Sequence, residues 1–329
     1  MRLSPKKHLA PLITAAALLA TLATVAWAQE DPAAPKDDAP QGDAQPTAAA
    51  EEPSEAAKEP QEEPAAKEGK DGRKLLLIGD SHTQGAYGWA LDYMMRDGIQ
   101  DSTVATYAVC ASGPMSWARG SIKHHCGKLV RTEDFEPDEK DPGLKAKGLI
   151  SGSHKAPKVL DLLNKHEPDV IVVALGENLK GFNLERVSEM TKDLAKRLEC
   201  YKRGETNEMK CREMDLEATK PTKDLTCVWV LPHHSTAKVS LSKLERLYET
   251  LTDATRNTCS TIDSRPLTCT KGHKDPNYVC DSPHNYHLSP KRYRLWALGT
   301  LDRLAAMLEL PLTREDYVDH MKANWGFKP

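Results

Sequence analysis

Residues 75–85 read Leu-Leu-Leu-Ile-Gly-Asp-Ser-His-Thr-Gln-Gly, an apolar run followed by a short polar stretch between two glycines. The continuous apolar run predicts a buried strand, and the glycines allow a tight turn after it. Ser81 would then stand at the end of the strand, where a following helix directs its N-terminal N–H groups. A serine in this position is exposed in the way that a nucleophile requires.

The rest of the folded part alternates between strand-like and helix-like segments. Apolar-rich segments predict strands at 73–79, 104–109, 169–175 and 227–231, and a short fifth strand is expected at 260–263. Apolar residues at helical spacing predict helices at 84–96, 159–166, 184–200, 241–257 and 290–309. This alternation predicts an α/β fold, a three-layer α/β/α sandwich around a mostly parallel five-stranded sheet. In such sheets, ligands bind beyond the carboxyl ends of the strands.

The first 28 residues have the features of a signal peptide. Lys6 and Lys7 precede a mostly apolar stretch at 9–27, and Ala26-Trp27-Ala28 forms a small-x-small cleavage site. An uncleaved membrane anchor is the alternative interpretation. The short apolar core and the cleavage site favour removal, so we expect a secreted or periplasmic bacterial protein without membrane insertion after cleavage.

The remainder divides into a spacer and one domain. Residues 29–72 are rich in Ala, Pro, Glu, Asp and Gln, a composition that cannot bury enough apolar surface to fold. We therefore expect a disordered spacer at 29–72 and a single domain at 73–329. Two polar stretches, at about 114–155 and 201–225, are expected to be insertions in that domain.

The eight cysteines all follow the spacer. An even count in an exported chain predicts disulfides, although eight cysteines allow 105 pairings. Proximity favours three pairs and leaves a fourth: Cys110–Cys126, Cys200–Cys211, Cys269–Cys280 and, by remainder, Cys227–Cys259. The spacing of a zinc site is absent from the sequence, so neither a metal nor a cofactor is expected.

Charge gives little indication of a macromolecular partner. The formal net charge is −3, and the basic stretch around His124 and His125 is short. Such a stretch is typical of a solvated loop, so we expect no nucleic-acid partner. We also expect the protein to be a monomer.

Several residues could together carry out acyl transfer. That reaction needs an exposed hydroxyl, a base, a group that orients the base, and donors for the oxyanion. Ser81 supplies the hydroxyl and, at the helix start, a backbone N–H. Gly113 offers a second N–H without a side chain in the way, and Asn178 offers an amide after the third strand. The predicted oxyanion hole is therefore Ser81, Gly113 and Asn178.

Two late histidines compete as the base. His287 precedes Leu-Ser-Pro and the last helix, which would hold it in place. His284 lies three residues after Asp281, a spacing that can bring a carboxylate against an imidazole. From the residues alone, both remain candidates.

Four short sequence blocks follow one another along the chain: Gly79–His82, Ala111–Gly113, Gly176–Asn178 and His287–Pro290. In this order they resemble the blocks of the GDSL/SGNH hydrolase superfamily, in the exported bacterial subgroup with a Gly-Asp-Ser-His start. Ser81 matches the first block, Gly113 the second, Gly176 and Asn178 the third, and His287 the fourth. The resemblance covers roughly residues 73–310. It implies a flavodoxin-like SGNH fold and a serine esterase.

The fourth block departs from the family pattern of Asp-x-x-His, because His284 stands at the Asp position. Asp281 could orient His287 from a longer loop, His284 with Asp281 could be the working pair, or a backbone carbonyl could orient a Ser–His dyad. We favour His287 as the base, with Asp281 as its partner.

The resemblance also frames the function. It implies hydrolysis of O-acyl esters, foremost acetyl esters of an extracellular or cell-wall glycan. The alternatives are an O-acetyltransferase that uses the same residues and a catalytically degenerate binding module.

The other polar and aromatic residues near these blocks have plainer interpretations. We expect Asp80 to stabilise the turn, His82 to lie at a pocket rim or in solvent, and His233 and His234 to be surface residues. Trp117 is expected to be a packing residue more than a sugar platform.

Overall fold

The computed structural model describes residues 72–99, 101–135, 148–235, 239–268, 288, 290–310 and 318. All of them belong to the compact unit Glu63–Pro329. The predicted signal peptide and all but the last residue of the predicted spacer lie outside the described residues. So do Asp281, His284 and His287.

The central sheet has five parallel strands in the spatial order β2-β1-β7-β8-β9. Strand β1 lies inside the sheet, and its Leu77 pairs with Thr106 of β2 and Val172 of β7. The predicted mostly parallel α/β sheet is confirmed. The bounds of these strands are β1 Lys74–Gly79, β2 Thr103–Val109, β7 Val170–Ala174, β8 Thr226–Val230 and β9 Ser260–Ile262.

Two further strands extend this sheet to seven, which corrects the predicted five. Strand β4 (Lys128–Arg131) pairs antiparallel with β2, and β5 (Leu149–Ile150) pairs antiparallel with β4. Both come from the stretch 114–155. Without β4, the backbone of β2 would present an unpaired edge. A separate two-stranded sheet joins β3 (Lys123–His124) to β6 (His154–Lys155).

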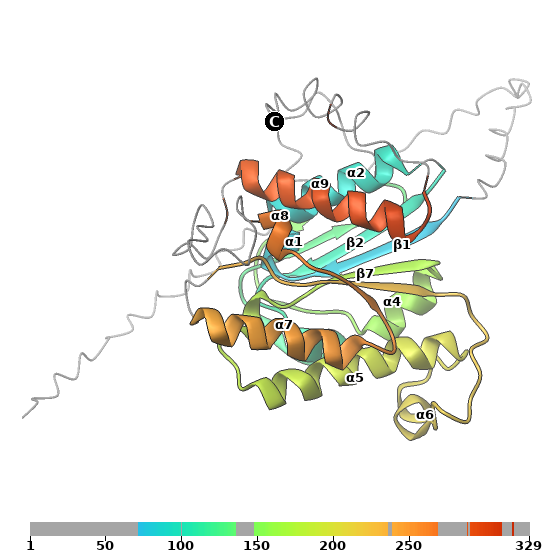
Figure 1. The fold of residues 1–329 in the computed structure, drawn as a ribbon. Helices are drawn as coiled ribbons and strands as arrows, with labels where there is room; N and C mark the ends of the chain where they lie inside the picture. The colour runs from blue at the N-terminus through green and yellow to red at the C-terminus, as the bar shows by residue number, and fades with distance from the viewer. Residues whose placement is uncertain are drawn as a thin grey trace, which may run out of the picture. The chain divides into compact units, whose positions relative to one another are not determined.

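Helices cover both faces of the sheet, as Figure 1 shows. Helices α2 (Ala86–Gly98) and α9 (Pro290–Met307) pack together on one face. The opposite face carries α4 (Val159–His166), α5 (Leu184–Lys202) and α7 (Leu241–Thr255). The shorter helices are α1 (Ser81–Gln84), α3 (Pro114–Arg119), α6 (Glu208–Glu213) and α8 (Arg265–Thr268).

Alternation along β1 divides the core into two apolar layers. Leu75 and Leu77 belong to the layer under α2 and α9, whereas Leu76 and Ile78 belong to the layer under α4, α5 and α7. All four side chains are at most 2 % exposed. A strand buried on both faces explains why its sequence is continuously apolar instead of alternating.

Capping side chains begin the two long helices that follow β7 and β8. Asn183 accepts a hydrogen bond from the backbone N–H of Glu185 at 2.8 Å, and Ser240 accepts one from that of Lys243 at 3.3 Å. These bonds satisfy backbone donors that have no partner inside the first helical turn. Both helices begin at the carboxyl edge of the sheet (Figure 1).

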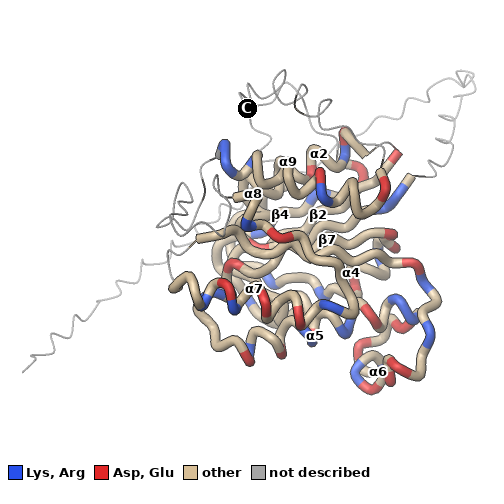
Figure 2. Tube along the Cα trace, in the orientation of Figure 1, with Lys and Arg blue, Asp and Glu red and all other residues tan. Residues whose placement is uncertain are grey.

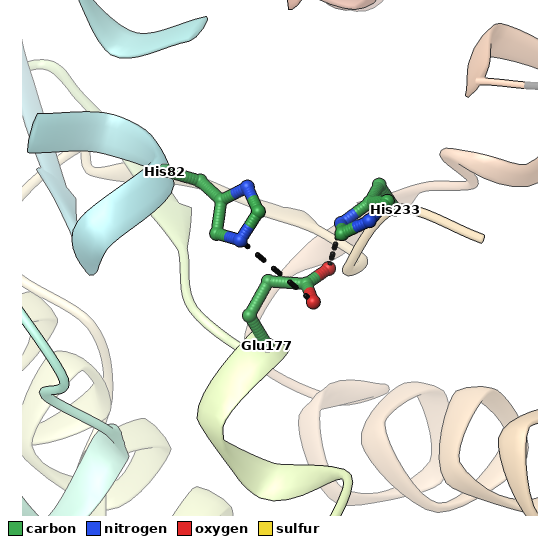
Figure 3. A group of neighbouring side chains, drawn as sticks. All are labelled: His82, Glu177 and His233. Atoms are coloured by element: carbon green, nitrogen blue, oxygen red, sulfur yellow. Dashed lines mark ion pairs between the residues drawn. The ribbon is translucent and has the colours of Figure 1, made fainter. Parts of the chain in front are cut away.

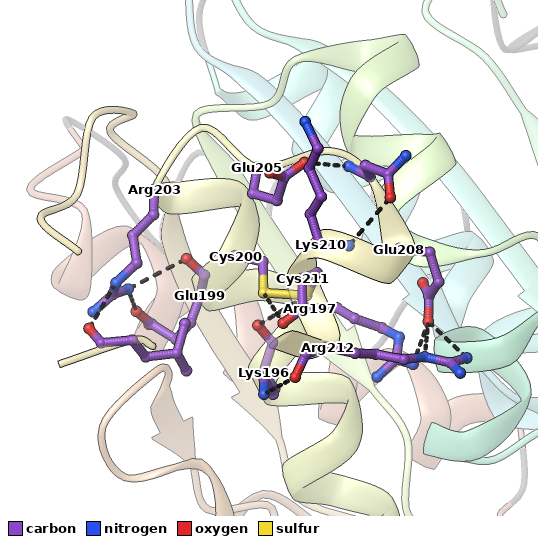
Figure 4. Close-up of a disulfide and its surroundings, with 12 residues drawn as sticks. Lys196, Arg197, Glu199, Cys200, Arg203, Glu205, Glu208, Lys210, Cys211 and Arg212 are labelled. Carbon is purple, nitrogen blue, oxygen red and sulfur yellow. Dashed lines mark hydrogen bonds and ion pairs between the residues drawn. A yellow bond between two sulfur atoms is a disulfide. The ribbon is translucent and has the colours of Figure 1, made fainter. Parts of the chain in front are cut away.

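Three disulfides lie within the described residues: Cys110–Cys126, Cys200–Cys211 and Cys227–Cys259. All three match the predicted pairs, whereas Cys269 and Cys280 lie outside the described residues. Figure 4 shows how Cys200–Cys211 ties the end of α5 to α6. Arg197 reinforces this link because its guanidinium pairs with Glu208 at 2.5 Å.

Charge and hydropathy add two findings about this part of the chain. Basic and acidic residues are interspersed along α5, α6 and α7 (Figure 2). Among the described helices, none combines the length and the apolar character that crossing a membrane would require.

Candidate active site

The turn after β1 places Ser81 as the sequence predicts. Asp80 caps α1, and its Oδ1 accepts a hydrogen bond from the backbone N–H of His82 at 3.0 Å. Gly79 allows the turn to close, since a Cβ there would lie 1.9 Å from Thr83 Oγ1. Asp80, His82 and Thr83 are buried, while Ser81 is partly exposed. The expected turn-stabilising role of Asp80 is confirmed.

Ser112 holds the three described blocks together. Its hydroxyl donates to the carbonyl of Gly79 at 3.3 Å, and its own carbonyl accepts a hydrogen bond from Asn178 Nδ2 at 3.0 Å. The blocks after β1, β2 and β7 are therefore linked at one edge of the sheet. The amide of Asn178 carries two N–H donors, and the bond to Ser112 uses one of them.

The next residue, Gly113, begins α3 and is partly buried. Its N–H donates to Ser116 Oγ at 3.4 Å, a long bond at the limit of the usual range. Trp117 is fully buried, and its indole N–H donates to Ser112 Oγ at 3.0 Å. The expectation that Trp117 is a packing residue is confirmed.

Gly176 shapes the third block. Its φ is 156°, and a Cβ there would lie 2.8 Å from Cδ of Pro232. A side chain at this position would therefore clash with the loop after β8. The close approach of the two loops lets the short 3₁₀ turn Glu177–Leu179 present Asn178 beside Ser112.

Glu177 forms the centre of a buried charged cluster that the sequence did not reveal. Its side chain is 2 % exposed, and Lys180 Nζ lies 2.7 Å from Oε2. His233 Nδ1 contacts Oε1, and His82 Nε2 lies 3.9 Å from Oε2. Figure 3 shows both imidazoles directed at the carboxylate. We call Glu177, Lys180, His82 and His233 the Glu177 cluster.

The cluster extends to two neighbouring segments. Lys180 Nζ also donates to the backbone carbonyl of His233 at 3.1 Å, which binds the loop after β8. The hydroxyl of Tyr293, in α9, lies 2.9 Å from His82 Nδ1. The cluster therefore connects the ends of β1, β7 and β8 with the last helix.

The burial of three histidines corrects three sequence-based expectations. His82, expected at a rim or in solvent, is 2 % exposed, and His233 and His234, expected at the surface, are 0 % and 3 % exposed. Glu177 contacts the rings of both His82 and His233, and Tyr293 contacts that of His82, and such polar partners allow these two imidazoles to be buried.

Burial and charge shift the pKa values in opposite directions. Burial raises the pKa of Asp80 from its ordinary 3.8 to about 7, and the nearby charge of Glu177 adds to this effect. Burial also tends to raise the pKa of Glu177, but His233, Lys180 and His82 outweigh it and hold that pKa well below 4.5. Burial lowers the pKa of His234 to about 4. The carboxylate of Glu177 is therefore the stable anion of this region.

The Glu177 cluster also contains the residue types of a metal site. Ligand atoms of His82, Glu177 and His233 all lie within 4.8 Å of one another, and two imidazoles with a carboxylate can bind zinc. In this structure the ammonium of Lys180 is the cation that pairs with the carboxylate. A cavity of about 10 Å³ beside the cluster, lined in part by Asp80, His82 and Glu177, has room for one water molecule.

His287, its alternative His284 and the predicted partner Asp281 lie outside the described residues. Leu288, which follows His287, is buried at 5 % exposure. The assignment of the base stays a prediction.

Comparison with known proteins gives distant likenesses. No family model matches the chain. Protein BcsX of Komagataeibacter xylinus is 23 % identical over 252 residues, covering 73 % of this chain and 81 % of that protein.

Similar solved structures include a candidate SGNH hydrolase from Slackia heliotrinireducens, with 11 % identity, a TM-score of 0.40, and coverage of 71 % of this chain and 100 % of that one. A family two carbohydrate esterase from Cellvibrio japonicus has 14 % identity and a TM-score of 0.39, with 72 % and 62 % covered.

Proposed function

We propose that this protein is an exported serine esterase that hydrolyses O-acyl esters, foremost acetyl esters of a polysaccharide or cell-wall glycan. One observation carries the proposal: Ser112 bonds Gly79 and Asn178, which joins the block that carries Ser81 to the two blocks that carry Gly113 and Asn178. Acyl transfer needs a nucleophile and oxyanion donors at a single place.

In the proposed mechanism, Ser81 Oγ attacks the carbonyl carbon of the ester, and its proton passes to His287, which Asp281 orients. The N–H groups of Ser81 and Gly113 and the amide of Asn178 stabilise the oxyanion of the tetrahedral intermediate. Collapse of this intermediate breaks the ester C–O bond, and the imidazolium returns the proton to the departing alcohol. Water, activated by the same histidine, then releases the acid from the acyl-enzyme.

A groove lined in part by α3, the helix that follows Gly113, supports a glycan as the acyl carrier. It has a volume of about 490 Å³ and runs between α3 and α5. Polar and charged side chains dominate its lining, which suits hydroxyl groups better than a lipid chain. The lining residues are Met115, Arg119, Asn183, Glu185, Arg186, Glu189, Met190 and Asp193.

The disulfides support an oxidising compartment outside the cytosol.

Two measurements test the proposal: labelling by a serine-directed probe and turnover of an ester substrate. A fluorophosphonate probe should label the mature wild-type protein, and the protein should hydrolyse p-nitrophenyl acetate faster than longer acyl esters. Ser81→Ala should lose both properties, because it removes only the attacking hydroxyl. The matched control is Ser242→Ala, an exposed serine of α7 that should keep wild-type behaviour.

Two results would contradict the assignment. Near-wild-type turnover by Ser81→Ala would mean that another residue is the nucleophile. A wild-type protein that neither reacts with the probe nor cleaves any ester would instead favour the degenerate binding module. Transfer of the acetyl group to an added glycan, in preference to water, would identify an O-acetyltransferase that uses the same acyl-enzyme.

A further inference from the structure

The Glu177 cluster adjoins each described block that would act on the ester, except the one at Gly113. Glu177 immediately precedes Asn178, and His82 immediately follows Ser81. The side chains of Glu177 and His82 meet beneath the two turns, with His82 Nε2 3.9 Å from Glu177 Oε2. A displacement of the carboxylate would therefore move the backbone on both sides of the site.

Lys180 supplies the fixed positive charge of the cluster. Its side chain and that of Glu177 are each 2 % exposed, and the two charges are 2.7 Å apart. A buried ion pair of this kind adds little net stability, because desolvation offsets the attraction. It does impose a direction on both side chains, since a buried charge that loses its partner is costly. We therefore expect the pair to act on geometry more than on total stability.

The last helix is joined to the same point. Tyr293 contacts His82 Nδ1 at 2.9 Å, and α9 begins at Pro290, three residues after His287. The helix that follows the predicted base is thus connected, through His82, to the turn that carries Ser81. The rings of His82 and His233 also lie near each other, with centroids 4.9 Å apart.

We propose that Glu177, held by Lys180, is a positioning residue that fixes the turns of Ser81 and Asn178 relative to each other through His82 and His233. This inference rests on the proposed esterase function. Glu177 touches no reacting atom in the proposed mechanism, so its effect should fall on kcat with little change in KM. A misplacement of about 1 Å in a catalytic group can lower a rate by about 100-fold.

Three variants separate a positioning role from a purely structural one. Glu177→Gln and Lys180→Met each remove one charge and leave the other buried, so both should lower Tm. The double variant removes both charges and should recover most of the lost Tm. We expect kcat on p-nitrophenyl acetate to fall by about 10- to 100-fold in Glu177→Gln and to stay low in the double variant, with KM within about 3-fold.

The control is Glu249→Gln, which makes the same substitution at an exposed position of α7 and should change neither Tm nor kcat. If kcat returns together with Tm in the double variant, the cluster has only a structural role and the proposal is wrong. If Glu177→Gln keeps the kcat of the wild type, the proposed positioning role is also wrong.

Two further outcomes concern the premise and the metal. Ser81→Ala is measured in the same assays. If the wild type is active and Ser81→Ala is inactive, the esterase function holds, and a contrary result for Glu177→Gln then overturns only the positioning role. An inactive wild type overturns the esterase function and the positioning role together. Metal analysis of the purified protein should find no stoichiometric zinc. One zinc per chain that disappears in Glu177→Gln would make the cluster a metal site and overturn the positioning role.

Discussion

Replacing Asp80 with asparagine should remove a pH-dependent loss of stability. Burial and the charge of Glu177 raise the pKa of Asp80 from 3.8 to about 7 in the folded protein. Between these pH values the unfolded chain has released the proton and the folded protein still holds it. The unfolded state then binds fewer protons, so the free energy of unfolding falls as the pH rises.

The magnitude follows from the difference between the two pKa values. A difference of 7 − 3.8 = 3.2, at 1.36 kcal/mol for each pKa unit, corresponds to about 4 kcal/mol over the whole range. About 2.5 kcal/mol of it falls between pH 5 and pH 8. Asparagine has nearly the shape of a protonated aspartate and keeps the oxygen that accepts the hydrogen bond from His82. We therefore expect Asp80→Asn to gain about 2.5 kcal/mol relative to wild type between pH 5 and pH 8.

Other titratable groups also make the stability depend on pH in this range. The quantity to measure is therefore the difference in the free energy of unfolding between Asp80→Asn and wild type. The lowered pKa of His234 makes stability fall as the pH drops from 6.5 toward 4, which opposes Asp80. The lowered pKa of Glu177 leaves its contribution complete above about pH 5. Both contributions largely cancel in the comparison as long as the substitution leaves their surroundings unchanged.

Urea unfolding at several pH values provides the assay. Trp229 and Trp296, at 0 % and 2 % exposure, report loss of the core by fluorescence. The matched control is Asp253→Asn, which makes the same substitution at a position that is 64 % exposed. If the stability difference between Asp80→Asn and wild type changes by less than about 0.5 kcal/mol from pH 5 to pH 8, the argument for a raised pKa is refuted.

Three further predictions concern the site and its support. Asn178→Ala should lower kcat by about 10²–10³-fold with a smaller change in KM, as steady-state kinetics would show, whereas a raised KM with unchanged kcat would indicate substrate binding. His287→Ala should be as damaging as loss of the nucleophile and His284→Ala less so; the reverse order of turnover rates would assign the base to His284. Removing Cys227–Cys259, with a sequence separation of 32, should lower the free energy of unfolding by about 3.5 kcal/mol in urea titrations, and an unchanged midpoint would contradict this.

Periodicity was sufficient for the parallel strands but not for the sheet edge. The run at 170–174 is apolar throughout because β7 is buried on both faces, so its sequence alone identifies it. Strand β4 has four residues and carries Lys128 and Arg131 at its ends. Arg131 is 1 % exposed because Asp92 accepts a hydrogen bond from its guanidinium at 2.9 Å. Because Asp92 is distant in the sequence, Arg131 has the appearance of a surface residue when the sequence is considered alone. The sequence therefore does not predict β4.

Contacts between residues that are distant in the sequence also explain which part of the candidate site the sequence predicts and which part it does not. Ser81, Gly113 and Asn178 each lie within four residues of the end of a parallel strand, so the topology of the sheet is enough to bring their blocks to one edge. The Glu177 cluster depends instead on how three loops fold over that edge, and no local pattern encodes this. Histidine, glutamate and lysine are also the residues that sequence reasoning assigns to solvent. They can be buried here because each charge faces its partner, and only the folded geometry makes that pairing visible.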